Sequence, residues 1–127
     1  MLVDSNIIIY AAMPEHAALR QFIAEHAPAV SAVSYVEVLG YHRLTAVERD
    51  ALEAFFVAAR ILPLSDTVLD QAMQLRQQKK MSLGDALVAG TAVVHGLALV
   101  TRNIDDFKWI AGLRLLNPFG DHPQPES

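Results

Sequence analysis

Short apolar runs alternate along this chain with longer segments whose apolar residues recur at helical spacing. The short runs predict five strands, within residues 2–3, 29–32, 60–64, 97–100 and 113–116. The longer segments predict helices over residues 7–12, 15–26, 34–43, 45–59 and 82–95, with another that begins at residue 66. Alternating strands and helices favour right-handed crossovers and a parallel sheet covered on both faces. We therefore predict an α/β fold in three α/β/α layers, with a short parallel sheet of four to five strands flanked by helices.

Several residues mark where these helices begin and end. Thr45 and Glu48 have the spacing of a capping box, and Gly96 suits the residue that follows a helix. Along the helix that begins at residue 66, five apolar residues are expected to face inward: Val68, Leu69, Ala72, Met73 and Leu75. We expect a single domain over residues 1–119, followed by a flexible C-terminal tail over residues 120–127.

Composition limits the class of protein. Hydrophobic residues make up 53% of the 127 residues, which is enough to fill a core. The chain contains no cysteine, so a disulfide framework, a thiolate zinc site and a cysteine nucleophile are excluded. It shows neither a signal-peptide pattern nor an apolar run of the roughly 18 residues that a membrane span needs. We expect a cytoplasmic protein without a membrane partner.

The charge balance points away from a broad nucleic-acid-binding face. Ten Lys and Arg residues oppose fourteen Asp and Glu residues, for a net charge of −4. If four of those fourteen acids surround a cation, ten acids remain to balance the ten basic residues. The acidic excess would then be a property of one site rather than of the whole surface.

Acids stand in four places where the surrounding pattern is apolar. Asp4 ends the first strand, Glu37 lies within an apolar helix, Asp85 precedes an apolar run, and Asp105 and Asp106 follow the fourth strand. Each has an ordinary structural explanation. Asp4 suits a helix N-cap, Glu37 and Asp85 each follow a serine by three residues as in a capping box, and Asp105 is a common turn residue.

Taken together, the acids predict a metal site. In the expected topology all four places approach one edge of the sheet, where the carboxylates would repel one another unless a cation neutralised them. An all-oxygen set suits Mg²⁺ or Mn²⁺, which can bridge phosphate oxygens and orient a water nucleophile. The sequence offers no Ser/His/Asp arrangement, glycine-rich phosphate loop or zinc signature as a rival.

These motifs resemble those of the PIN-domain family, and within it the VapC-type toxins of toxin–antitoxin pairs. The resemblance rests on Asp4-Ser5-Asn6, Glu37 in its Val-Glu-Val-Leu context, Gly84 to Ala89, and Thr101-Arg102-Asn103 with Asp106-Phe107. It covers the whole chain except the tail. It implies a PIN-like fold and a ribonuclease that hydrolyses phosphodiester bonds with Mg²⁺ or Mn²⁺.

The resemblance also assigns roles to residues. It implies that Asp4, Glu37 and Asp85 hold the metal directly or through water, and that one of them takes the proton of the attacking water. Asp106 is the expected fourth catalytic acid, because Asn103 stands where the family often has an acid and would hold a water or a phosphate. The remaining candidates orient the acids or meet the substrate: Ser5 in place of the usual threonine, Asn6, Thr101, Arg102, Lys79 and Lys80.

Partners follow from the same resemblance. It implies an RNA substrate, a homodimer, and a cognate antitoxin whose C-terminal segment covers the acidic pocket. Five aromatic residues are candidates for lining that groove or the dimer contact, although more than half are expected in the core: Tyr10, Tyr35, Tyr41, Phe55 and Phe56.

Two other functions remain open at this point. A receiver-type phosphotransfer module also gathers acids at strand ends, but it needs a lysine after a later strand, where this chain has Thr101-Arg102-Asn103. A catalytically degenerate PIN-like module that binds RNA or protein is favoured only by Asn103 in place of an acid.

Overall fold

A computed structural model describes residues 1–120 of the chain. The predicted tail, apart from Gly120, lies outside the described residues. Within them, no helix combines the length and the apolar character needed to cross a bilayer.

Helices and strands alternate along the chain, as predicted. In chain order they are β1 (Leu2–Val3), α1 (Ser5–Ala11), α2 (Ala17–His26), β2 (Val30–Ser31), α3 (Ala32–Leu39), α4 (Ala46–Ala58), β3 (Ile61–Leu62), α5 (Asp66–Gln78), α6 (Leu83–His95), β4 (Leu99–Val100), α7 (Ile104–Phe107) and β5 (Leu115–Leu116). The capping box of Thr45 with Glu48 is confirmed at the start of α4. Gly96 is also confirmed after α6, where its φ of 65° is one that glycine adopts without strain.

The strands form two short parallel sheets joined at one bridge. β1 pairs with β4 and β4 with β5, while β2 pairs with β3. A parallel bridge between Leu2 and Ala29 connects the two sheets. The strand order across the molecule is therefore β5-β4-β1-β2-β3, and the predicted fold class is confirmed.

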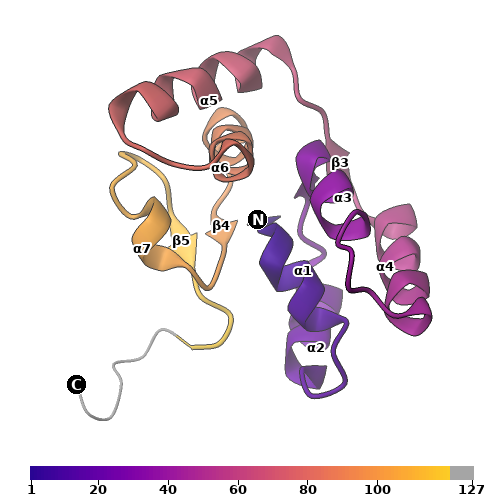
Figure 1. Cartoon of the computed structure of the whole chain (residues 1–127). Coiled ribbons are helices and arrows are strands. Elements are labelled where there is room, and N and C mark those ends of the chain that lie inside the picture. The colour runs from indigo at the N-terminus through magenta and orange to yellow at the C-terminus, as the bar shows by residue number, and fades with distance from the viewer. Residues whose placement is uncertain (121–127) are drawn as a thin grey trace.

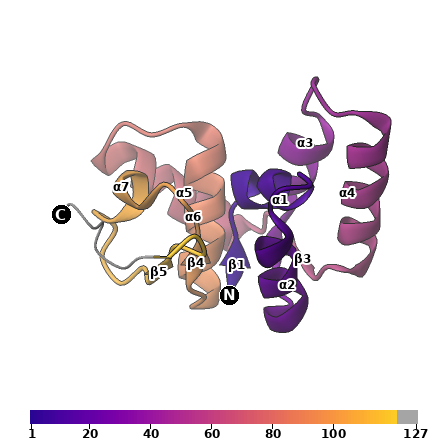
Figure 2. The same cartoon turned by 90° about the horizontal axis from the view of Figure 1, so that it is seen from below.

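Helices cover both faces of these strands. Leu2 and Leu99, which are register partners, pack in a core with residues of α5, α6 and α7. The next pair, Val3 and Val100, points to the opposite face and packs with residues of α1 to α4. Figures 1 and 2 show this division, with α5, α6 and α7 gathered on one side and α1 to α4 on the other. The alternation of side chains along each strand thus creates three layers.

The strand order has a switch point between β1 and β4. From β1 the chain adds β2 and β3 on one side, whereas β4 and β5 lie on the other side. In open parallel sheets, ligands bind at the carboxyl ends of the strands where the order reverses in this way. Asp4 and Thr101 directly follow these two strands.

Two helices differ from the expectation. The side chains of Leu69 and Met73 on α5 are 46% and 50% exposed, so the prediction that they face inward is wrong, whereas Val68, Ala72 and Leu75 are buried as expected. The short helix α7 stands where only turn residues were expected. Four residues are too few for a periodic pattern to reveal a helix.

The start of α3 also differs from the expectation. The helix begins at Ala32 and is capped by Ser31, whose hydroxyl accepts from the Val33 N–H group. Ser34 therefore lies inside the helix and cannot form a capping box with Glu37. This correction removes the structural explanation for Glu37.

Candidate active site

Asp4 occupies the switch point between β1 and β4. It ends β1 and caps α1, with Oδ1 accepting from the Ser5 N–H group at 2.8 Å. Oδ2 accepts from the Thr101 hydroxyl at 2.9 Å, which ties the ends of the two strands together. The N-cap explanation is therefore correct. The cap accounts for the position of Oδ1, whereas the position of Oδ2 depends on the tertiary contact with Thr101.

Burial disfavours the ionised form of the Asp4 carboxyl. The residue is only 5% exposed. Burial raises the pKa of its carboxyl to about 6, and the nearby charges of Asp85 and Glu37 add to the rise, while the hydrogen bonds from Thr101 and Ser5 oppose it. A buried acid near other acids is typical of a site that binds a cation.

Glu37 reaches this site from α3 and is held by Ser5. The Ser5 hydroxyl lies 2.6 Å from Glu37 Oε1 and 2.8 Å from the Ser34 hydroxyl. Because a hydroxyl carries one proton, Ser5 donates to the carboxylate and accepts from Ser34. Gly84 provides the space for this arrangement, since a β-carbon at residue 84 would clash with Glu37 Oε2.

Asp85 lies beside Glu37 in the first turn of α6. Its N–H group donates to the Ser82 hydroxyl at 3.1 Å, as a helix cap requires. Burial raises the pKa of the half-buried Asp85 carboxyl, and so do the charges of Asp106 and Glu37, against a lowering by Ser82. Asp85 therefore lies within electrostatic reach of both acids.

The segment after β4 supplies the remaining predicted residues. The Thr101 hydroxyl accepts from the Asn103 N–H group at 3.1 Å while it donates to Asp4. The exposed Asp106 lies on α7 near Asp85. Asp105 instead forms an ion pair with Lys108 at 2.9 Å, which holds the pKa of Asp105 below its ordinary value.

Two predicted residues lie apart from this network. The exposed Asn6 follows Ser5 on α1, and no hydrogen bond of its side chain is present in the described part of the chain. The guanidinium of Arg102 stacks on two aromatic rings, 4.5 Å from the Phe119 centroid and 5.6 Å from the Tyr10 centroid. The structure thus brings together Asp4, Ser5, Glu37, Asp85, Thr101 and Asp106, and engages Arg102 elsewhere.

The chemistry of the acids fits a hard divalent cation. Among residues 1–120, no three Asp, Glu, His or Cys side chains lie close enough together to hold a metal ion directly. Asp85 and Glu37 nevertheless raise the pKa of Asp4, and Glu37 also raises that of Asp85, so these carboxylates share one region. Mg²⁺ usually keeps several of its waters and binds proteins through one or two carboxylates, so a looser all-oxygen set suits it.

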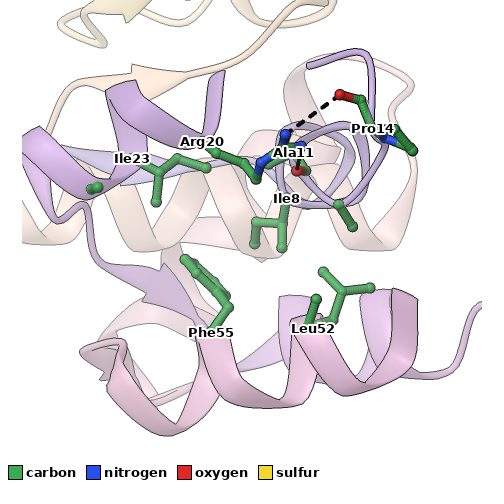
Figure 3. Close-up of a pocket in the computed structure, with 10 residues that line it drawn as sticks. Ile8, Ala11, Pro14, Arg20, Ile23, Leu52 and Phe55 are labelled. Carbon is green, nitrogen blue, oxygen red and sulfur yellow. Dashed lines mark hydrogen bonds between the residues drawn. The ribbon is translucent and has the colours of Figure 1, made fainter. Parts of the chain in front are cut away.

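One hollow adjoins the acids, and another lies among the helices of the opposite layer. One, of about 610 Å³, is lined by Asp85 and Asp106 and also by cations of α5 and the loop that follows it. The other, of about 420 Å³, lies between α1, α2 and α4 and is mostly apolar, with Ile8, Leu52 and Phe55 on its walls. Figure 3 shows these side chains pointing into the second hollow, with Arg20 at its margin. The Arg20 guanidinium donates to the carbonyls of Ala11 and Met13 at 3.0 and 2.6 Å.

Two residues of the site were missed by sequence reasoning. Ser34 carried a signal, its spacing from Glu37, but that spacing indicated a helix cap rather than a contact with Ser5. Gly84 was part of a recognised motif, yet its role depends on the approach of α3 to α6, which no local pattern reveals.

Comparisons with known proteins agree with this geometry. The family model of the PIN domain matches residues 1–113. A toxin–antitoxin complex from Klebsiella pneumoniae contains a chain that is 28% identical, with a TM-score of 0.73 over 92% of this chain and 96% of that one. VapBC2 from Rickettsia felis, bound to a promoter DNA fragment, is 23% identical, with a TM-score of 0.79 over 91% of this chain and 96% of that one.

A shorter similarity involves a protein described as a ribonuclease. Ribonuclease VapC1 of Rickettsia felis is 44% identical over 41 residues, which make up 32% of this chain and 31% of that protein. The match thus spans about a third of that relative. The family model, in contrast, covers nearly all the described residues and includes every acid of the site. The chain therefore belongs to the PIN domain family.

Proposed function

We propose that this protein is a metal-dependent endoribonuclease and the toxin of a toxin–antitoxin pair. The observation that carries the proposal is the buried Asp4 at the switch point, with a pKa raised to about 6 and with Glu37 and Asp85 close enough to contribute to the rise. Membership of the PIN family and similarity to a toxin–antitoxin complex and a ribonuclease VapC1 support it. The cytoplasm is the compartment in which we expect it to meet its RNA.

Asp4, Glu37 and Asp85 are the proposed metal-holding residues. A bound Mg²⁺ or Mn²⁺ would activate water and neutralise charge on the scissile phosphate. Ser5 fixes the direction of Glu37, and Thr101 fixes that of Asp4, so neither carboxylate has to be ordered when substrate arrives.

Asp85 is the proposed acceptor of the proton from the attacking water. It is only half-buried, and its raised pKa makes it a stronger base than an ordinary aspartate. The negative charge of Asp106 helps to raise the pKa of Asp85. We therefore propose a catalytic role for Asp106, although Asn103 stands where the family often has an acid.

The apolar hollow between α1, α2 and α4 is the proposed docking site of the antitoxin. Its walls carry Ile8, Leu52 and Phe55, and Arg20 lies at its margin (Figure 3). An amphipathic segment with apolar anchors and an acidic residue near Arg20 would match both features. The similarity to structures of toxin–antitoxin assemblies supports a protein partner of this kind.

The first experiment is cleavage of total cellular RNA by antitoxin-free protein. We expect discrete products with Mg²⁺ or Mn²⁺, and no products with EDTA or with the Asp4→Asn variant. Asp50→Asn, a change of an exposed acid on α4, is the matched control and should cleave like the wild type. Folded protein that binds metal but cleaves neither total RNA nor structured RNAs would instead indicate a degenerate binding module.

A further inference from the structure

A group of cations borders the acidic site on one side. Arg76 lies in the last turn of α5, Lys79 follows that helix, and Lys80 lies in the loop that leads to α6. All three line the 610 Å³ hollow that Asp85 and Asp106 also line. Within residues 1–120 the one ion pair joins Lys108 to Asp105, so Arg76, Lys79 and Lys80 have no carboxylate partner there. The Arg76 Nε–H group donates to the Met81 carbonyl at 3.3 Å, which leaves the other guanidinium nitrogens and the two lysine ammonium groups available to phosphates.

Trp109 forms an aromatic wall of the same hollow. One part of the indole packs against the core, and its Nε1–H group donates to the Asp106 carbonyl at 3.0 Å, which fixes the ring plane. A face of the ring remains accessible to the Lys79 ammonium, which lies 5.7 Å from the centroid. A fixed aromatic face beside free cations is the combination that binds single-stranded nucleic acid.

We propose that this hollow receives an unpaired stretch of RNA next to the scissile phosphate, with one base stacked on Trp109. The inference rests on the proposed ribonuclease function and names the residues that hold its substrate. Lys79, Lys80 and Arg76 bind the flanking phosphates, and the base displaces the Lys79 ammonium from the ring. A paired base is excluded, because both of its faces are already stacked within the duplex.

Trp109 provides its own probe, since it is the one tryptophan of the chain. Wild-type protein in EDTA, where the acids lack metal and cleavage is prevented, is titrated with a short unstructured RNA and with a fully paired duplex of the same sequence. We expect saturable quenching of tryptophan fluorescence by the single strand and not by the duplex. Equal quenching by both would overturn the assignment.

Variants test the contact by the binding of labelled RNA. Trp109→Leu keeps an apolar side chain against the core and removes the ring, and should weaken binding about ten- to a hundredfold. Trp109→Phe should retain most of the affinity. Binding by the leucine variant equal to that of the wild type, with circular dichroism unchanged, contradicts the proposal.

The cations are tested by the salt dependence of binding. Lys79→Gln and Lys80→Gln should each lower the slope of log affinity against log salt by about 0.7, the value expected for one phosphate contact on a single strand. Arg49→Gln removes an exposed charge from α4, in the opposite layer, and should leave the slope unchanged. A slope unaffected by the lysine changes would place the RNA elsewhere.

The two proposals fail in different ways. If metal-dependent cleavage is insensitive to Trp109→Leu, the proposed RNA-binding role of the hollow is wrong and the proposed ribonuclease function stands. If single-stranded RNA binds tightly and quenches the fluorescence but is not cleaved with any metal, the proposed ribonuclease function is wrong and the RNA-binding role of the hollow is supported. Absence of RNA binding and of cleavage overturns both.

Discussion

Asp4 lies where burial and neighbouring charge both oppose ionisation. Its carboxyl has a pKa of about 6 in the folded protein, against an ordinary value of 3.8. The native state therefore binds more protons than the unfolded chain between these two pH values, and the free energy of unfolding falls as pH rises through that window. The penalty is complete above pH 6 and corresponds to about 3 kcal/mol.

We therefore expect Asp4→Asn to stabilise the metal-free protein at neutral pH. The asparagine carbonyl can accept from the Ser5 N–H group, and its amide can face Thr101 without carrying a charge. The difference in free energy of unfolding between variant and wild type should grow from pH 4 to pH 6 and then stay constant. Urea denaturation at a series of pH values measures it. A difference that does not change with pH would show that Asp4 ionises normally.

Gly84 is the residue whose substitution should separate activity from stability. A β-carbon there would displace the end of the Glu37 side chain, which can rotate away because it is exposed. Alanine in a helix is also favoured over glycine by up to about 1 kcal/mol. We expect Gly84→Ala to lower cleavage at least tenfold while the melting temperature is unchanged or higher.

A double-mutant cycle provides the control for this prediction. If Gly84→Ala acts through Glu37, the change should have little further effect on cleavage in a Glu37→Gln background. Independent, additive losses in the double variant would mean that Gly84 acts by another route.

The site shows which residue roles a sequence can reveal. Asp4 was predictable because it follows a strand, and parallel strands end at a common edge, whereas the role of Thr101 came from the resemblance to the PIN-domain family. The hydrophobic pattern identified Glu37 only as an acid among apolar residues, and its role at the metal came from the resemblance to the PIN-domain family. The partners of Glu37 depend on α3 beginning at Ala32, directly after its cap residue Ser31, whose hydroxyl also lies 3.3 Å from that of Thr91 on α6. That contact joins residues 60 positions apart, so no local pattern determines it.

At the scale of elements, α5 carries an apolar stripe that the fold of one chain leaves uncovered. Leu69 and Met73 are four residues apart and so lie on one face of the helix. A periodic pattern shows that a face is apolar, but it does not show whether the same chain or another chain covers it. The homodimer implied by the resemblance to VapC-type toxins is the contact that we expect to cover this stripe.

The stripe yields a prediction about assembly. We expect the wild type to be a dimer and Met73→Glu to be a monomer, because a charge buried in an apolar interface is costly. Val57→Glu makes the same change at an 88% exposed position on α4 and should leave the dimer intact. Sedimentation velocity distinguishes the species. A monomeric wild type, or a dimer lost only in the α4 variant, would refute the assignment of the stripe.

At the scale of the whole molecule, the acids come from separate parts of the fold. Asp4 follows β1 at the switch point, Glu37 arrives on α3, and Asp85 opens α6. The alternation of helices and strands made the three layers predictable. The approach of α3 to α6, which places Glu37 above Gly84, is a consequence of packing between those layers.

A cation bound by these three acids would therefore connect parts of the fold that otherwise repel one another. We expect Mg²⁺ or Mn²⁺ to raise the melting temperature of the wild type, because a ligand that binds only the native state stabilises it. At a hundred times its dissociation constant the gain is about 2.7 kcal/mol, or roughly 10 °C for a domain of this size. Calorimetry at several metal concentrations measures the rise.

The Asp4→Asn variant makes this prediction specific. Without metal at neutral pH, the variant should melt above the wild type, because it lacks the buried charge. At about a thousand times the dissociation constant the order should reverse, because the wild type then gains about 4.1 kcal/mol while the variant gains little. That gain exceeds the roughly 3 kcal/mol penalty of the buried charge. Because loss of packing would lower both melting temperatures, only the removal of a repelling carboxylate that also binds metal produces this crossing. Parallel responses of the two proteins to metal would mean that the cation binds away from Asp4.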